Sequence, residues 1–500
     1  MIKKHKLNLI VFILFSSLKV CAQNDTLFPS WINTSYNFIY FGDSSYLKNT
    51  VRLLGKKNEK FTILHIGDSH LQNENLPNQS RKLFQSIQGD AGIGLIVPFS
   101  TVKSYDARFY KSTHSGVWHC AKSYLGKFDY PMGVRGMTSY TEDSNATFKI
   151  SFFQKVSYAN NELIVFRHAS DSVFDMSFMV DDSLAILKYA DEKCAVYNVK
   201  GGFSILSFKV VKNNSLQKDL IITGLVLQDS LHRGGTWHNA GVGAAPYRMV
   251  LSEAYYEDEA KFLNPDLVIV DLGTNDFLYY NRIEPSLRGQ IIEVIEKVKK
   301  ANPSADIILT DAQEMRYKGK RTTVASDFSE MMYSLANEFH CGFWSYYHVS
   351  GQKNAWQFWD AAKFTQGDGI HLNGKGSELK GTLMFQAITN SVTLIRDAKC
   401  KSKILESDKD TLTWNDSLVM GSNIAISDSV FTSKLKPEVH AKFNDKQNKK
   451  STSLSATYLV KKGDTLGAIA MKTKVPIAKI KKLNHLQSDK IKIGQRLKLK

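Results

Sequence analysis

The chain has 500 residues, which is too long for one ordinary domain, and 43% of them are hydrophobic, so it can bury more than one core. Its formal net charge is +17, but residues 457–500 hold twelve Lys and Arg against two Asp and account for +10, and four lysines among the first 22 residues account for another +4. The other 434 residues carry only +3, which argues against a nucleic-acid-binding protein.

Residues 1–22 are typical of a secretory signal peptide. Three lysines precede an apolar run over residues 7–18, and a cleavage site follows at Ala22. The run is too short to cross a bilayer, and no later stretch approaches that length. Cys21 raises the alternative of a lipid anchor, but lipoprotein signals usually carry a small residue where this chain has Val20. We therefore expect simple cleavage, export to the periplasm or beyond, and no integral membrane segment afterwards.

Four cysteines remain after cleavage, in a compartment where disulfides are possible. They are Cys120, Cys194, Cys341 and Cys400. None belongs to a Cys-x-x-Cys pair, so we expect no zinc site, and three disulfide pairings stay open.

The first regular element is a short apolar strand over residues 61–66, which ends at Gly67-Asp68-Ser69-His70. Such a segment is ordinarily only a turn. The alternative is a nucleophilic serine on a strand-to-helix turn, where its hydroxyl is exposed beside free backbone N–H groups. That alternative needs a histidine, a carboxylate and oxyanion donors elsewhere in the chain.

Residues 96–229 differ in character, because short alternating runs are separated by polar turns. We expect strands over 147–156, 162–168, 173–180, 203–211 and 219–227. Strands at this spacing predict an antiparallel β-sandwich. Its role is either scaffold or sugar binding, and the candidate aromatic residues are Tyr105, Tyr110, Trp118, Tyr124 and Tyr130.

Residues 230–398 alternate strands with helices. We expect strands over 266–272, 306–309 and 342–348, and helices from about 285, over 328–339 and after 373. This order predicts a parallel sheet with helices on both faces, a three-layer α/β/α fold. The strand over 61–66 fits the same sheet, so residues 55–95 and 230–398 form one domain that the sandwich interrupts.

The second half of this domain contains the missing chemical groups. Asn275 follows a parallel strand, at the sheet edge where ligands bind in such folds, and its amide can donate to an oxyanion. Asp368 precedes His371 by three residues, a spacing that lets the carboxylate hold one imidazole nitrogen while the other faces a serine. A small-residue loop over 237–245 lets a backbone N–H approach a substrate. Each segment alone could be structural, but together they favour Ser69 as a nucleophile.

These four segments resemble blocks I, II, III and V of the SGNH (GDSL-type) hydrolases, with His70 in place of the usual leucine of block I. The resemblance implies that Ser69 is the nucleophile, His371 the base and Asp368 its orienting carboxylate. Asn275 and the N–H of Ser69 would line the oxyanion hole. The third donor of the family is a block II glycine, but here the aligned residue is Ala244, so Gly241 or Gly243 is an alternative donor. The resemblance implies no metal or other cofactor.

Residues 401–456 are rich in Ser, Asp, Lys and Asn and are expected to form a flexible linker. Residues 457–500 resemble a LysM module along their whole length, which predicts a strand, two short helices and a strand. This resemblance implies binding to N-acetylglucosamine-containing glycans, chiefly peptidoglycan and chitin. The sandwich between blocks I and II also resembles the arrangement in peptidoglycan O-acetylesterases.

The sequence therefore predicts a secreted, cell-wall-associated serine esterase that removes O-acetyl groups from a glycan, most simply peptidoglycan. Two alternatives remain: a glycan O-acetyltransferase that uses the same triad, and a non-catalytic wall-binding protein. We expect a glycan partner and no nucleic acid.

Overall fold

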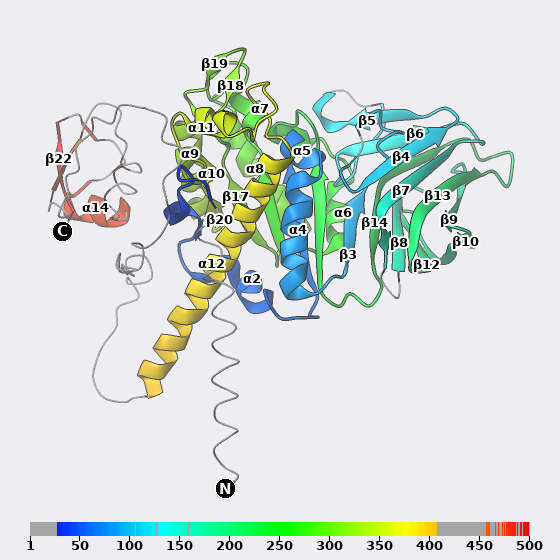
Figure 1. Ribbon diagram of the computed structural model, residues 1–500, viewed down its shortest axis with the longest axis horizontal. Coiled ribbons are helices and arrows are strands. Elements are labelled where there is room, and N and C mark those ends of the chain that lie inside the picture. Colours follow the sequence, from blue (N-terminus) through cyan, green and yellow to red (C-terminus); the bar gives the residue numbers. More distant parts are fainter. Residues whose placement is uncertain are drawn as a thin grey trace, which may run out of the picture. The chain divides into compact units, whose positions relative to one another are not determined.

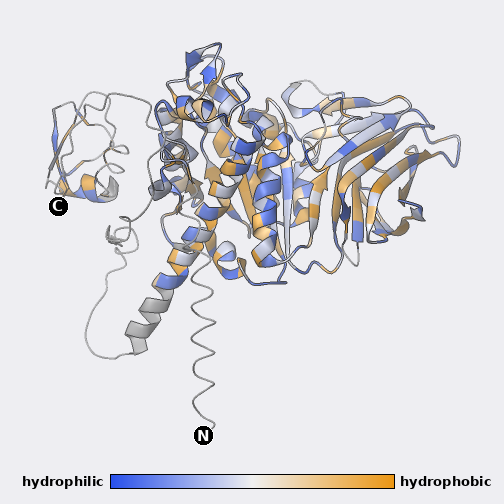
Figure 2. Cartoon of the chain, viewed as in Figure 1, coloured by the Kyte–Doolittle hydropathy of each residue, from blue (hydrophilic) through white to orange (hydrophobic). Residues whose placement is uncertain are grey.

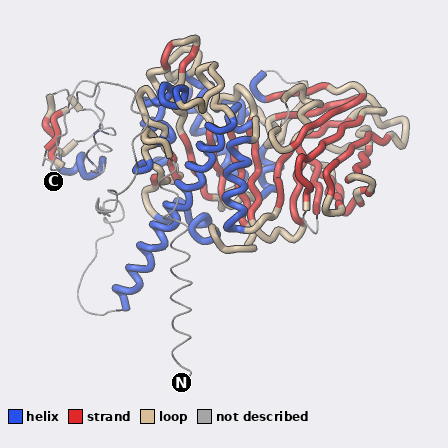
Figure 3. Tube along the Cα trace, in the orientation of Figure 1, coloured by secondary structure: helices blue, strands red, loops and turns tan. Residues whose placement is uncertain are grey.

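The computed structural model describes residues 28–105, 107–125, 129–157 and 161–407, and parts of the stretch 457–499. The chain divides into two compact units, residues 1–397 and 398–500, which are described separately below. Figure 1 shows the first unit as a sheet flanked by helices and joined to a region built of strands, and Figure 3 shows the same division by secondary structure.

A mainly parallel sheet forms the centre of the first unit. Its order is β1 (Ile39–Tyr40), β20 (Gly342–Trp344), β17 (Asp306–Thr310), β16 (Leu267–Asp271), β2 (Phe61–Gly67) and β15 (Gly235–Gly241). Each pairing is parallel except that of β1 with β20. The strands β2, β15, β16 and β17 are buried along their whole length, as expected of a parallel sheet covered on both faces.

Alternate residues of β2 enter two separate cores, one on each face of the sheet. Phe61 and Ile63 pack in the core that contains α4 (Asn75–Gln88) and α12 (Gly374–Ser407). Leu64 and Ile66 pack in the other core, with α6 (Tyr256–Leu263), α8 (Leu287–Ala301) and α9 (Ala325–Glu338). The predicted three-layer α/β/α architecture is therefore confirmed, and Figure 2 shows the hydrophobic residues concentrated in the sheet between the helices.

Two predictions within this domain were wrong. The loop expected over 237–245 begins as the edge strand β15, because its polar side chains find buried partners: Asn239 donates to the backbone of Leu71 and accepts from Gly241 N–H. The strand expected over 342–348 ends at Trp344, and the short helix α10 (Tyr346–Val349) follows.

The inserted region contains two antiparallel sheets. One has the order β10 (Ser183–Leu184), β9 (Asp175–Val180), β13 (Phe203–Val211), β7 (Thr147–Val156) and β4 (Tyr110–Ser115). The other has the order β11 (Ile186–Ala190), β12 (Cys194–Val199), β8 (Asn161–Arg167), β14 (Leu220–Asp229), β6 (Met137–Thr141) and β5 (His119–Lys122). Their inner faces meet where Phe178 of β9 lies against Tyr197 of β12, with ring centroids 5.1 Å apart. The predicted sandwich is thus present.

The sandwich begins earlier than the sequence predicted. Strand β3 (Gly92–Ile96) already pairs with β14, although residue 96 was the expected start. Its glycines break the alternating pattern that marks the later strands. Two of the aromatic residues proposed for sugar binding, Tyr110 and Trp118, belong to the buried core, whereas Tyr105 is 53% exposed.

The second unit contains an antiparallel pair of strands, β21 (Thr457–Leu459) and β22 (Arg496–Lys498), and the helix α14 (Ile477–Leu483). A small core of Val460, Leu466, Ile469, Ile480, Leu497 and Leu499 joins them. Most of the predicted first helix lies outside the described residues.

Other predictions also fall outside them. The proposed signal peptide is not described, and of the proposed linker only its first seven residues are, as the end of α12. That helix continues beyond residue 400 because neither Gly nor Pro interrupts it there. A search of the described helices finds none with the length and apolarity needed to traverse a bilayer. Cys120, Cys194 and Cys341 are free thiols.

Candidate active site

Ser69 is the first residue of a short helix, α3 (Ser69–Gln72), at the carboxyl end of β2. Gly67 allows the chain to pass close to the end of β16, since a Cβ atom there would lie 2.8 Å from the carbonyl oxygen of Asp271. Asp68 caps the helix, because its carboxylate accepts a hydrogen bond from the N–H of His70 at 2.9 Å. The strand-to-helix turn expected from the sequence is therefore present.

The structure brings Ser69 together with two residues from the far end of the domain. Ser69 Oγ lies 2.8 Å from Nε2 of His371, and Nδ1 of His371 lies 2.5 Å from Oδ2 of Asp368. The other Asp368 oxygen accepts from the N–H groups of Ile370 and His371, each at 2.8 Å. Burial opposes ionisation of Asp368, but these hydrogen bonds outweigh it and lower the pKa of the carboxyl. An ionised Asp368 can therefore orient the imidazole.

Asn275 lies in α7 (Thr274–Phe277), just beyond β16. Its Nδ2 lies 3.3 Å from Oδ2 of Asp68 and 3.2 Å from the carbonyl oxygen of Ala245. Both amide hydrogens therefore have an acceptor in this state, at long distances. An oxyanion near Ser69 would have to compete with one of these acceptors for Asn275.

The turn after β15 distinguishes the three backbone donors proposed from the sequence. The N–H of Gly241 donates to Oδ1 of Asn239, and that of Gly243 donates to Oε1 of Gln72. Ala244 is exposed and has a φ of +60°, and within the described part of the chain no group accepts from its N–H. Ala244 is thus the residue of the three whose N–H remains available to a ligand.

Gln72 was not identified from the sequence. It is buried, its Oε1 accepts a hydrogen bond from the N–H of Gly243, and its Nε2 donates to Oγ of Ser104 at 2.8 Å. It therefore links the turn that carries Ala244 to a loop of the inserted region. No sequence signal marks it, because its two partners lie far away in the chain.

The role of His70 was also missed. Its Nδ1 lies 2.9 Å from Oδ1 of Asp68, and its Nε2 lies 3.3 Å from the carbonyl oxygen of Ile370, next to His371. Burial alone would lower the pKa of His70, but the Asp68 carboxylate outweighs burial and the pKa is raised. A doubly protonated ring can donate from both nitrogens, as this geometry requires. His70 thereby connects the block I turn to the loop of His371.

The insertion also contributes Arg135, which is fully buried and donates through Nη1 to the carbonyl oxygen of Gly241. Its Nη2 lies 3.9 Å from Oε1 of Glu74. Burial raises the pKa of Glu74, and the guanidinium of Arg135 opposes that rise. The strand end that precedes Ala244 is therefore held from the sandwich side.

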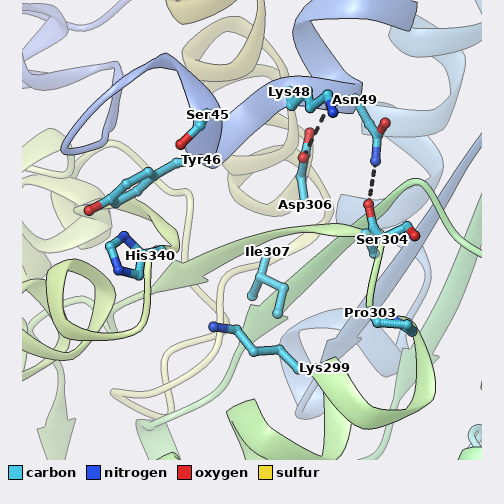
Figure 4. A pocket seen from close by; sticks show the side chains of 11 residues that line it. Ser45, Tyr46, Lys48, Asn49, Lys299, Pro303, Ser304, Asp306, Ile307 and His340 are labelled. Carbon is cyan, nitrogen blue, oxygen red and sulfur yellow. Dashed lines mark hydrogen bonds between the residues drawn. The ribbon is translucent and has the colours of Figure 1, made fainter.

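A separate pocket lies at the amino end of β17, whereas Ser69 and Asn275 follow the carboxyl ends of their strands (Figure 4). Asp306 is engaged there by the N–H groups of Asn49 and Thr50, at 3.2 and 2.6 Å. The pocket is lined by none of the candidate catalytic residues, and we assign it no function. Across the described residues, no cluster of His, Cys, Asp and Glu suited to a metal ion was found.

Comparison with protein families gives two matches. The model of the GDSL-like Lipase/Acylhydrolase family matches residues 223–379, and that of the LysM domain matches residues 458–500. The first match contains Asn275, Asp368 and His371 but not Ser69, which the sandwich separates from it. A search of curated proteins gave no significant match.

Among solved structures, one described as "Peptidoglycan O-acetylesterase in action, 5 min" is 19% identical, with a TM-score of 0.58 over 74% of this chain and 99% of that one. This likeness shows a common fold. A family two carbohydrate esterase from Clostridium thermocellum is 9% identical, with a TM-score of 0.26 over 55% of this chain and 98% of that one, too low to support an argument. Residues 223–379 are therefore similar to the GDSL-like Lipase/Acylhydrolase family, residues 458–500 are similar to a LysM domain, and the first unit shares the fold of the O-acetylesterase structure.

Proposed function

We propose that this protein is a serine esterase that removes O-acetyl groups from a cell-wall glycan, peptidoglycan in the first instance, and that Ser69, His371 and Asp368 are its catalytic triad. The observation that carries the proposal is the continuous hydrogen-bonded series from Ser69 Oγ through both nitrogens of His371 to Asp368. This is the arrangement that activates a serine for acyl transfer.

In the proposed reaction, Ser69 Oγ attacks the acetyl carbonyl carbon while His371 Nε2 takes the hydroxyl proton. The N–H groups of Ser69 and Ala244 stabilise the oxyanion, and Asn275 joins them by releasing one of its long hydrogen bonds. His371 then returns the proton to the departing sugar oxygen, leaving an acetylated Ser69. A water molecule, deprotonated by His371, hydrolyses this ester and releases acetate.

The substrate class rests on two likenesses. The fold is shared with a protein described as a peptidoglycan O-acetylesterase, and LysM modules bind N-acetylglucosamine-containing glycans. The signal-like residues 1–22 are consistent with export to the cell wall, where such glycans lie. In this proposal the LysM domain raises the local substrate concentration through its tether.

Acetate release from O-acetylated peptidoglycan, measured beside acetylated xylan, tests the proposal. We expect the wild type to prefer peptidoglycan and Ser69→Ala to lose on the order of 10⁴-fold or more in rate while it still folds. Near-normal turnover by Ser69→Ala would exclude Ser69 as nucleophile. Transfer of acetyl to an added glycan acceptor, with little free acetate, would instead identify an acetyltransferase.

A further inference from the structure

A short hairpin packs directly on the loop that carries Asp368 and His371. It consists of β18 (Arg316–Tyr317) and β19 (Lys320–Arg321), and Figure 1 shows it at the same end of the unit as α7. The N–H of Arg316 donates to the carbonyl oxygen of Gly369 at 2.7 Å. A Cβ atom on Gly369 would overlap the backbone of Arg316, so the two segments are in close contact.

The hairpin is also tied to the segment that follows Asn275. Oδ1 of Asn281 accepts from the N–H of Thr323 at 2.6 Å, and its Nδ2 donates to Thr323 Oγ1 at 3.1 Å. At the base, Arg321 forms an ion pair of 3.1 Å with the buried Glu314. The hairpin therefore has a fixed position between two elements of the proposed active site.

Aromatic and cationic side chains are displayed here, beside the site. Tyr279 and Tyr280 are 54% and 72% exposed, and the ring of Tyr279 meets that of Tyr317 edge to face, with centroids 5.2 Å apart. Lys318 and Lys320 are exposed, and neither forms an ion pair with any described residue. Nζ of Lys318 lies 5.2 Å from the Tyr317 ring centroid. We call these five residues the Tyr–Lys rim.

Exposed tyrosines and unpaired lysines offer two kinds of contact. A tyrosine ring presents a large, rigid apolar face with a polar tip, which suits the C–H face and hydroxyls of a sugar ring. An unpaired ammonium group attracts carboxylates, and the attraction is greatest where no acidic neighbour neutralises it. A glycan that carries carboxylates can use both contacts at once.

We propose that the Tyr–Lys rim is a substrate-binding subsite that selects anionic, carboxylate-bearing glycans over neutral ones. The proposal rests on the proposed function and adds a reason for peptidoglycan to be preferred, since its peptide stems carry carboxylates whereas acetylated xylan and chitin are neutral. Arg316, one residue from Tyr317, contacts Gly369 in the loop that carries Asp368 and His371, so the rim lies on an element that packs against this loop.

The test is the double variant Lys318→Ala/Lys320→Ala, assayed on soluble O-acetylated peptidoglycan fragments and on O-acetylated chitin oligomers. We expect KM for the anionic fragments to rise roughly three- to tenfold at low salt, the size expected for two exposed ion pairs, and KM for chitin oligomers to change less than twofold. The difference should shrink at 0.5 M salt. Turnover of a small aryl acetate should not change.

Lys149→Ala/Lys209→Ala is the matched control, because both lysines are exposed on the sandwich and the variant loses the same charge. Tyr280→Ala tests the aromatic contact. The Tyr280 ring stacks on no other described ring, although Arg282 Cζ lies 5.5 Å from its centroid, so the ring is free to pack against a sugar. Its loss should therefore raise KM for both glycans. An unchanged KM of the lysine variant for anionic fragments, or an equal rise in the control, overturns the rim proposal while the esterase function stands.

Failure of the function itself would look different, because the wild type would then release no acetate from either glycan. In that case calorimetric binding of unacetylated anionic fragments to the wild type and the lysine variant tests the rim alone. Equal affinity of the two proteins would overturn it.

Discussion

Gln72→Ala should lower kcat without abolishing the fold. The change removes the acceptor of the Gly243 N–H and the donor to Ser104, and each hydrogen bond contributes about 0.5–1.5 kcal/mol to stability. The neighbouring Ala244 has a φ of +60°, a conformation that costs a non-glycine residue roughly 1–2 kcal/mol. Without Gln72, we expect the turn to relax and the Ala244 N–H to leave its position.

Complete loss of one oxyanion donor lowers kcat by about 10²–10³-fold. Because Asn239 and Arg135 still hold Gly241, we expect partial displacement of Ala244 and a decrease of roughly 10- to 50-fold, with KM nearly unchanged. The assay is steady-state hydrolysis of an aryl acetate, with the melting temperature measured in parallel. Gln72→Glu keeps the acceptor for Gly243 and should recover much of the activity.

Gln79→Ala is the matched control, since Gln79 also bridges two elements through its amide, donating to Thr382 at 3.1 Å, but has no contact with the turn. It should lose some stability and keep its kcat. If Gln72→Ala retained kcat within twofold of the wild type, the turn would hold its shape without Gln72 and the reasoning would be refuted. A rise in KM at constant kcat would make Gln72 a substrate-binding residue instead.

Three further predictions concern the oxyanion hole, the LysM domain and pH. Asn275→Ala should lower kcat about 10²–10³-fold with little change in KM, whereas a weaker KM at constant kcat would make it a substrate contact. Deletion of residues 457–500 should leave aryl acetate hydrolysis unchanged but slow the action on insoluble peptidoglycan and reduce sedimentation with it, even at 1 M salt, where charges are screened within roughly 3 Å. Burial raises the pKa of Glu259 to about 7, although Thr223 Oγ1 and the Val134 N–H partly oppose it, so the protonated form is the one that the fold favours. Unfolding free energy should therefore fall by up to about 3 kcal/mol as pH rises from 4.5 to 7, and Glu259→Gln should flatten that dependence in denaturant titrations.

The sequence predicted those parts of the fold in which one local pattern determines one structure. Continuous apolar runs gave β2, β16 and β17, and alternating runs gave β7 and β13 of the sandwich. β15 was misread because its strand conformation depends on burial beside β2 and β3, not on its own composition. A polar segment that is fully buried cannot be recognised without its neighbours.

The candidate site likewise has residues that local sequence motifs indicate and supporting contacts that only the structure reveals. Ser69, Asn275, Asp368 and His371 could be proposed from the sequence because each lies in a recognisable short motif at a strand end or turn. The structure adds that Ala244, rather than either glycine, has the available N–H, which depends on the positions of Gln72 and Asn239. Such supporting hydrogen bonds join residues far apart in sequence, so local patterns do not reveal them.

The insertion contributes to the architecture of the candidate site. Its core is continuous with the core on the face of the parallel sheet that carries α6, α8 and α9. Arg135 donates to the carbonyl oxygen of Gly241 at the end of β15, and Ser104 accepts from Gln72, which itself accepts from the N–H of Gly243 in the turn that carries Ala244. Gln72 holds that turn from the α3 side while Arg135 holds it from the sandwich side. We therefore expect the Ala244 N–H, the proposed oxyanion donor, to take its position only when the sandwich has folded against the parallel sheet. The long insertion between Ser69 and His371 thus contributes to preorganising the site, which a simple sugar-binding appendage would not do.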